Sequence, residues 1–287
     1  MTRSRVARCA RLAVSLFALT LNAACASTVV AQIPYAAIDD SARAAPAADV
    51  RIAYGAAATQ FIELRVPSGG GGPYPVVMLL HGGCWRAAYS LAHLAGAAES
   101  LRAAGYATWT PEFRRVGDEG GGVPGTFDDI RAAYDSLIAQ ARTRGLDPAR
   151  IVLAGHSAGG QLALWLASEP RVKVRGVVAL AGITDLAAFA APAGCGAAVP
   201  LLLGGTSAEL PDVYVSFSPV SRPAAPTTVT LVTARDDRTV PQAQRDVYLA
   251  RFPSTKVLMV PGGHFDLVAP WSEAWREIVA VVRTLNP

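Results

Sequence analysis

Residues Gly155–Gly160 read Gly-His-Ser-Ala-Gly-Gly, and the residues on either side decide how this stretch folds. Arg150–Ala154 precedes it with a short, β-branched and apolar run that is typical of a buried strand. Gln161–Ser168 follows it with good helix formers and no glycine or proline, which predicts a helix. A Gly-x-Ser-x-Gly turn between a strand and a helix is the context of a nucleophile elbow. Ser157 is therefore the candidate nucleophile, and the alternative is a structural serine in a glycine-rich turn.

Strand and helix patterns alternate on both sides of this turn. Apolar or alternating runs predict further strands at 60–66, 75–80, 106–110, 176–181, 228–233 and 256–260. Helical patterns predict helices at 91–104, 126–144, 241–252 and 270–284. This alternation predicts an α/β fold with a mostly parallel central sheet and helices on both faces. Residues 183–226, rich in Ala, Pro and Gly, interrupt it, and we interpret them as a short cap-like insertion over the active-site end.

The first residues have the composition of an export signal. Four arginines within the first eleven residues precede the apolar run Leu12–Leu21, and small residues follow. We therefore expect a signal peptide at 1–26 and export through the secretory route to the periplasm or the medium. A lipid-modified Cys25 is the less favoured alternative, because Asn22 stands where such a signal usually has leucine.

Composition limits the remaining function classes. The chain has 287 residues, of which 52% are hydrophobic, which is enough for one large core. We expect a single α/β domain over 51–287 after a flexible, alanine-rich linker at 27–50. The net charge of +4 comes from the four N-terminal arginines, because the other basic residues balance the 22 acids. A near-neutral body predicts no nucleic-acid partner, and no later segment is apolar and long enough to predict a membrane span.

Two cysteines, Cys84 and Cys195, follow the predicted signal. Two interpretations stay open, namely a disulfide, which an exported protein can retain, and a pair of buried thiols. The cysteine spacing and the singly scattered histidines do not predict a metal site, and we expect no metal and no cofactor.

A serine hydroxyl needs a base that takes its proton. His264 follows the last predicted strand on a loop, which makes it the candidate base; the alternative is a loop histidine without a role. His93 falls within a predicted helix, and His81 ends a strand where another role is expected. We expect the turn to direct the side chain of His156 away from the hydroxyl.

The imidazole in turn needs an acid that fixes its tautomer. Residues 235–241 read Arg-Asp-Asp-Arg-Thr-Val-Pro after a predicted strand, so the acid is Asp236 or Asp237. The chain order serine, aspartate, histidine is that of an α/β-hydrolase rather than of chymotrypsin or subtilisin.

Four motifs together resemble the α/β-hydrolase superfamily, from about residue 51 to the C-terminus. They are His-Gly-Gly-Cys-Trp at 81–85, Gly-His-Ser-Ala-Gly-Gly at 155–160, Asp-x-x-Val-Pro at 237–241 and Gly-Gly-His-Phe at 262–265. More narrowly, they look like small bacterial carboxylesterases near the prolyl-oligopeptidase-like and kynurenine formamidase branches. The resemblance implies that Asp237, not Asp236, is the acid of the triad.

The resemblance also implies an oxyanion hole made of the backbone N–H groups of Gly83, Cys84 and Ala158. Cys84 stands where the hormone-sensitive-lipase pattern has a third glycine, which disfavours that branch. It does not disfavour catalysis, because only the backbone of residue 84 would donate. The alternative is a glycine-rich turn without this function.

Several other side chains are candidates for the walls of a substrate pocket. Arg114–Arg115 could contact a substrate carboxylate, but we favour solvated loop charges. Among the aromatic residues, Trp109 and Trp165 are expected to pack in the core rather than to line a pocket. The aromatic candidates are Trp85, Tyr89, Trp109, Phe113 and Trp165.

These observations predict a serine hydrolase that cleaves a carboxylic ester of a small acyl group through an acyl-enzyme intermediate. An amide hydrolase, either a formamidase or a short peptidase, is the first alternative. The chain shows no propeller domain like that of the prolyl oligopeptidases, so the ester ranks first. A catalytically silent binding protein of the same fold is the second alternative, and the intact motifs disfavour it.

Overall fold

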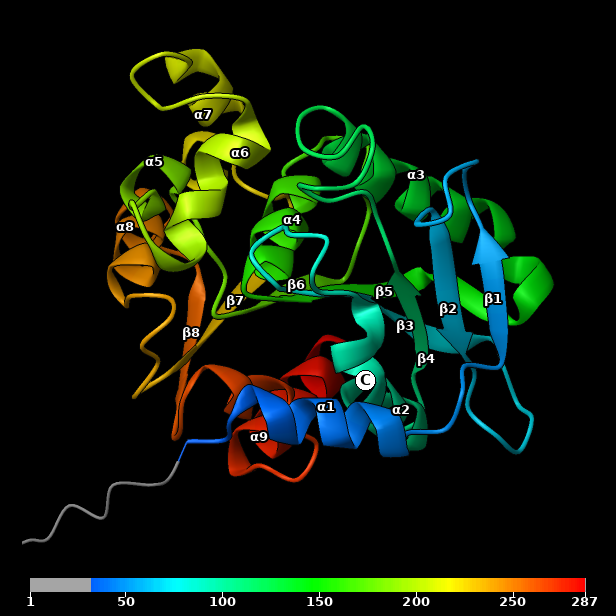
Figure 1. Cartoon of the computed structure of the whole chain (residues 1–287). Helices are drawn as coiled ribbons and strands as arrows, with labels where there is room; N and C mark the ends of the chain where they lie inside the picture. Colours follow the sequence, from blue (N-terminus) through cyan, green and yellow to red (C-terminus); the bar gives the residue numbers. More distant parts are fainter. Residues whose placement is uncertain (1–31, 287) are drawn as a thin grey trace, which may run out of the picture.

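A computed structural model of the chain describes residues 32–286 (Figure 1). The predicted signal peptide at 1–26, with Cys25, lies outside the described residues. Within residues 32–286, no helix combines the length and the hydrophobicity needed to cross a bilayer.

The core of the molecule is one eight-stranded sheet in the order β1-β2-β4-β3-β5-β6-β7-β8. β1 and β2 pair antiparallel, β2 and β4 pair antiparallel, and every pair from β4 to β8 is parallel. The mostly parallel sheet predicted from the sequence is thus confirmed. The strands are β1 Val50–Ala53, β2 Phe61–Arg65, β3 Tyr74–Leu80, β4 Ala107–Pro111, β5 Leu146–His156, β6 Gly176–Leu180, β7 Thr228–Ala234 and β8 Lys256–Val260.

Helices cover both faces of this sheet, as predicted (Figure 1). α2 and α9 lie on one face with α1 outside them, and α3, α4 and α8 lie on the other. The bounds are α1 Tyr35–Ala44, α2 Ala95–Ala103, α3 Gly125–Gln140, α4 Ala158–Ala167, α8 Ala243–Arg251 and α9 Glu273–Leu285.

Two of these helices show how the sequence sets burial. Apart from Gln161, α4 consists of apolar residues and glycine, and every one of its residues is buried, as expected of a helix enclosed by other elements. α9 buries one stripe only, which includes Trp275, Ile278 and Val282. The Ser272 side chain accepts a hydrogen bond from the Trp275 N–H and caps the start of this helix.

The segment between β6 and β7 leaves the strand-helix alternation, as residues 183–226 predict. It contains α5 Leu186–Phe189, α6 Val199–Leu203 and α7 Pro211–Phe217, with 3₁₀ turns at Gly194–Ala198 and Pro219–Ser221. In Figure 1 these short helices gather on the side of the sheet that carries α4 and α8.

Over residues 32–50 the structure differs from the expected flexible linker at 27–50, of which residues 27–31 lie outside the described residues. Residues 35–44 form α1, and residues 50–53 form β1. Ile38 is the one fully buried residue of α1, and three of the four β1 residues are exposed. Such short elements, each with one buried apolar side chain, leave too little periodicity to be predicted.

Candidate active site

Ser157 occupies the sharp turn between β5 and α4, as the motif predicts. Its backbone angles are φ 56° and ψ −118°, a conformation that L-residues rarely adopt and that is typical of a nucleophile elbow. The Ser157 N–H donates to the Leu180 carbonyl of β6 at 2.8 Å, which ties the turn to the sheet.

The glycines of the motif are required by close approach of backbone atoms. A Cβ at Gly155 would lie 2.1 Å from the Gly159 carbonyl oxygen, and one at Gly159 would lie 2.2 Å from the Leu80 oxygen. Neither distance is compatible with a side chain, so only glycine allows the helix to start this close to the strand.

The predicted base and acid meet across the ends of β7 and β8. His264 Nδ1 lies 2.8 Å from Asp237 Oδ2, and both side chains are almost fully buried. Asp236, the alternative acid, is exposed on the same loop. The geometry therefore pairs His264 with Asp237.

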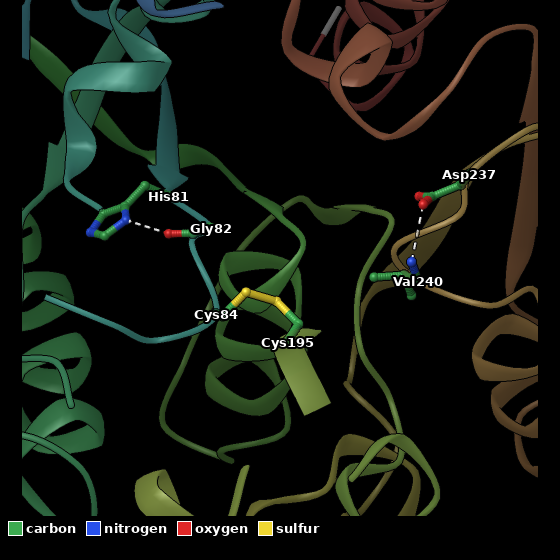
Figure 2. Close-up of a disulfide and its surroundings, with 6 residues drawn as sticks. All are labelled: His81, Gly82, Cys84, Cys195, Asp237 and Val240. Carbon is green, nitrogen blue, oxygen red and sulfur yellow. Dashed lines mark hydrogen bonds between the residues drawn. A yellow bond between two sulfur atoms is a disulfide. The ribbon is translucent and has the colours of Figure 1, made fainter. Parts of the chain in front are cut away.

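The loop prepares Asp237 to remain ionised. Its Oδ1 accepts hydrogen bonds from the backbone N–H groups of Thr239 at 2.7 Å and Val240 at 3.0 Å, the latter drawn in Figure 2. Burial on its own would raise the pKa of Asp237, but the hydrogen bond and charge of His264, with these two N–H groups, lower it overall. A carboxylate held in this way accepts from Nδ1–H and leaves Nε2 of His264 to take a proton.

Ser157 and His264 line one pocket. Among the described residues, the Ser157 hydroxyl makes no hydrogen bond to the imidazole. Such bonds are often long without substrate and shorten in the substrate complex.

The loop after β3 brings the predicted oxyanion donors to the same pocket. Gly83 and Cys84 line it, with φ of 100° and 55°. Ala158, the first residue of α4, follows Ser157 directly. Within residues 32–286, the N–H groups of these three residues donate to no protein acceptor, so they are available to a ligand oxygen.

Of the two interpretations for the cysteines, the structure has the disulfide. Cys84 and Cys195 are bonded with their Cα atoms 5.1 Å apart (Figure 2). Cys195 belongs to the 3₁₀ turn Gly194–Ala198, so the bond joins the loop after β3 to the insertion. Both cysteines line the pocket.

The loop after β3 begins at a buried network of ionisable side chains. His81 Nε2 lies 2.8 Å from Glu112 Oε1, and Glu112 also pairs with Arg115 at 3.0 Å. Arg115 further pairs with Asp118, and Arg114 with Asp129. The expected solvated charges at Arg114–Arg115 are thus wrong, because the Arg115 guanidinium binds Glu112 and Asp118 and the Arg114 guanidinium binds Asp129 of α3.

The pocket has a volume of about 260 Å³ and a mainly aromatic wall. Of the predicted aromatic candidates, only Tyr89 lines it, while Trp85, Phe113, Trp109 and Trp165 are buried. The full lining is Tyr35, Gly83, Cys84, Tyr89, His93, His156, Ser157, Cys195, Thr239, His264 and Phe265.

Two further histidines, neither of them predicted as the base, lie in this wall. The His156 ring lies 4.4 Å from the His264 ring, and its Nε2–H donates to the His264 carbonyl at 3.0 Å. His156 therefore lines the same pocket and packs against His264. His93 donates from Nδ1 to the Ser90 carbonyl at 2.9 Å. Burial, followed by neighbouring histidine charge, lowers the pKa of His93 to about 3 and that of His156 well below its usual value.

These histidines do not form a metal centre. Within the described part of the chain, no three histidine, cysteine or acidic side chains are grouped so that they could hold an ion.

Comparisons with known proteins agree with this architecture. The BD-FAE family model matches residues 62–251, which is more than half of the chain and contains Ser157 and Asp237 but not His264. Comparison with the curated proteins gives no match.

Several solved structures share the fold. Esterase B from Lactobacillus rhamnosis is 20% identical with a TM-score of 0.73, covering 87% of this chain and 90% of its own. A truncated carbohydrate esterase from gut microbiota is 18% identical with a TM-score of 0.70, covering 84% and 97%. The hyperthermophilic esterase from Pyrobaculum calidifontis is 19% identical with a TM-score of 0.66, covering 88% and 87%. Similarity at such identities shows the fold alone, whereas the family match covers most of the domain. The chain therefore belongs to the BD-FAE family and has an α/β-hydrolase fold.

Proposed function

We propose that this protein is a serine hydrolase that cleaves carboxylic esters with a small acyl group. The observation that carries the proposal is the buried Asp237–His264 hydrogen bond. His264 lines the same pocket as Ser157, which lies at its strained elbow. A general base that is oriented by an acid and lies beside a hydroxyl is the arrangement that nucleophilic catalysis requires.

In the first half-reaction, Ser157 Oγ attacks the ester carbonyl carbon while His264 Nε2 takes the hydroxyl proton. The carbonyl oxygen becomes an oxyanion, which accepts hydrogen bonds from the N–H groups of Gly83, Cys84 and Ala158. Each such donor contributes roughly 3 kcal/mol to transition-state stabilisation. Collapse of the tetrahedral intermediate breaks the bond to the alkoxide, which leaves with the proton from His264.

In the second half-reaction, water replaces the alcohol. The water oxygen attacks the acyl-enzyme carbonyl carbon while His264 takes a proton from that water. The bond to Ser157 Oγ then breaks, Oγ recovers the proton, and the carboxylic acid leaves. Asp237 stays ionised throughout and stabilises the imidazolium of each half-reaction.

Pocket size and the named neighbours support a small ester over other substrates. A volume of about 260 Å³ is below the usual range for drug-sized ligands, and aromatic rings and the disulfide form much of the wall. The three similar structures described above are all named as esterases. Esterase B is also described with a tributyrin phosphonate inhibitor, a reagent class that targets nucleophilic serines.

The disulfide also supports export of the protein, which we propose on the basis of the N-terminal pattern. Disulfides persist in oxidising compartments such as the periplasm and are rare in the cytosol. The Cys84–Cys195 bond therefore fits a protein that leaves the cytosol.

The test is hydrolysis of p-nitrophenyl acetate by the wild type and by Ser157→Ala. We expect the substitution to lower kcat by at least about 10⁴-fold, because it removes the hydroxyl that forms the acyl-enzyme in the proposed mechanism. Ser254→Ala, an exposed serine outside the pocket, is the matched control and should keep wild-type turnover. Turnover that persists in Ser157→Ala would refute the serine mechanism.

Rates on acetyl esters, N-formylkynurenine and proline-containing dipeptide amides distinguish the ester from the amide alternatives. The proposal predicts the highest kcat/KM on the acetyl esters. A higher kcat/KM on either amide would reassign the enzyme to that reaction.

A further inference from the structure

Residues 32–44, here called the N-terminal arm, contribute a wall to the pocket around Ser157. Tyr35, the first residue of α1, lines that pocket. Its ring packs edge-on against Tyr89 with 5.7 Å between centroids and lies 5.3 Å from Phe265. The three rings come from separate parts of the chain, and the N-terminal arm contributes the Tyr35 ring.

The arm is hydrogen-bonded to the loops that carry His264 and Asp237. The Ile33 N–H donates to Asp266 Oδ2 at 3.2 Å, and the same oxygen accepts from the Gly263 N–H at 2.9 Å. Gln32 Nε2 donates to the carbonyl of Asp236 at 2.6 Å, next to Asp237. The position of Tyr35 is therefore coupled to the two loops of the site.

α1 is also anchored by packing, which keeps this wall in place. Ile38 is only 1% exposed and belongs to the main hydrophobic core. A Cβ built at Gly96, near the start of α2, would lie 2.5 Å from Ser41 Oγ, which shows how closely α1 and α2 pack here.

The Tyr35 ring remains a neutral surface at physiological pH. Burial, followed by the nearby Asp39 carboxylate, raises the pKa of Tyr35 to about 12. Packed against other rings, the neutral Tyr35 ring occupies space that a longer alkyl chain of the substrate would need.

The acyl group is the part of the substrate that this pocket must enclose. After the alcohol has left, the acyl group remains covalently attached to Ser157, within the pocket that Tyr35 closes on one side. We propose that Tyr35, supplied by the N-terminal arm, determines the length of the acyl chain that the enzyme accepts. This inference rests on the proposed ester hydrolysis.

The test is the kcat/KM of p-nitrophenyl esters from acetate to octanoate for the wild type, Tyr35→Ala, Tyr35→Phe and Tyr35→Trp. Tyr35→Ala should raise the octanoate-to-acetate ratio roughly tenfold or more, since one methylene in an apolar pocket can change selectivity by that factor. Tyr35→Trp should lower the ratio, and Tyr35→Phe should keep it. Ala36→Ser, exposed on the same helix, is the matched control and should also keep it.

Each other outcome overturns the inference. An unchanged ratio in folded Tyr35→Ala would show that Tyr35 does not limit the acyl chain. An equal loss on every ester would show a purely structural role for the arm. A change with alcohol length alone, measured on methyl to octyl acetates, would place the alcohol and not the acyl group against Tyr35. A wild type that hydrolyses no ester would overturn the proposed function as well, whereas the three preceding outcomes leave it intact.

Discussion

At the scale of single residues, neighbouring side chains of the same type differ in role because they differ in burial and partners. Asp236 and Asp237 are adjacent on one loop. The side chain of Asp237 is 3% exposed, and it accepts two backbone hydrogen bonds as well as that of His264. Asp236 is exposed, so its charge is screened by water.

This difference gives a direct mutational comparison. Asp237→Asn should lower kcat on p-nitrophenyl acetate by about 10⁴-fold, because an amide in place of the carboxylate favours the wrong tautomer of His264. Asp236→Asn should change kcat less than about threefold, as expected of an exposed residue. Equal losses in the two variants would contradict the assignment of Asp237.

His93 provides a second test at this scale, through stability. Its folded-state pKa of about 3 lies below the 6.5 of an unfolded histidine. The unfolded state therefore binds more protons between these values, and stability present above pH 6.5 is lost as the pH falls toward 3. From pH 6.5 to 4.5 the loss from this group is on the order of 2 to 3 kcal/mol.

The measurement is urea unfolding at pH 7.5, 6.0 and 4.5 for the wild type and His93→Asn. Asparagine can keep the hydrogen bond to the Ser90 carbonyl but does not titrate, so the variant should lose less stability on acidification. Parallel pH dependences for the two proteins would show that His93 is not held neutral.

Some residues of the site could be predicted from the sequence, and others could not. Ser157, Asp237 and His264 could be predicted because each follows a strand pattern, and parallel strands end at one edge of a sheet. The structure places them accordingly. Tyr35 and His93 reach the pocket by the packing of α1 and the 3₁₀ turn Leu91–Leu94, which local periodicity does not encode.

At the scale of elements, the disulfide connects two loop segments that β4, β5 and β6 separate in the sequence. It joins the loop after β3 to the insertion across 111 residues of sequence. The sequence left this pairing open because the distance between the two cysteines depends on how the insertion packs.

Removal of the bond should destabilise the domain. Cys195→Ser should lower the free energy of unfolding by on the order of 2 to 5 kcal/mol, since a cross-link over a loop of this length restricts the unfolded chain. Urea denaturation measures the change. The double variant Cys84→Ser/Cys195→Ser should lose about as much as the single one, because both remove the same bond. A wild-type unfolding curve for Cys195→Ser would contradict this account of the bond.

The short elements at the N-terminus show the limit of periodicity. β4 is buried along its whole length and β5 contains the buried apolar run at 151–154, and the sequence predicts both strands. The bounds of β4 differ by one residue, whereas β5 begins four residues earlier and ends two residues later than predicted. α1 and β1 each have a single fully buried residue, Ile38 and Ile52, and were missed. Tertiary contacts, rather than a local pattern, stabilise such elements.

At the scale of the whole molecule, the sheet assembles the site from distant parts of the chain. β3, β5, β7 and β8 each lead into a loop that contributes to one pocket. The insertion adds Cys195, and the N-terminal arm adds Tyr35. The sequence predicts this architecture because the strand-helix alternation and the order of the motifs both indicate the same fold.

The most direct test of the account is the site of acylation during turnover. Wild-type protein is mixed with p-nitrophenyl acetate, quenched in acid within the first turnovers, and digested for peptide mass spectrometry. We expect one acetyl group, attached to Ser157. Acetylation of a different residue, or continued turnover with an unmodified Ser157 peptide at every quench time, would contradict it.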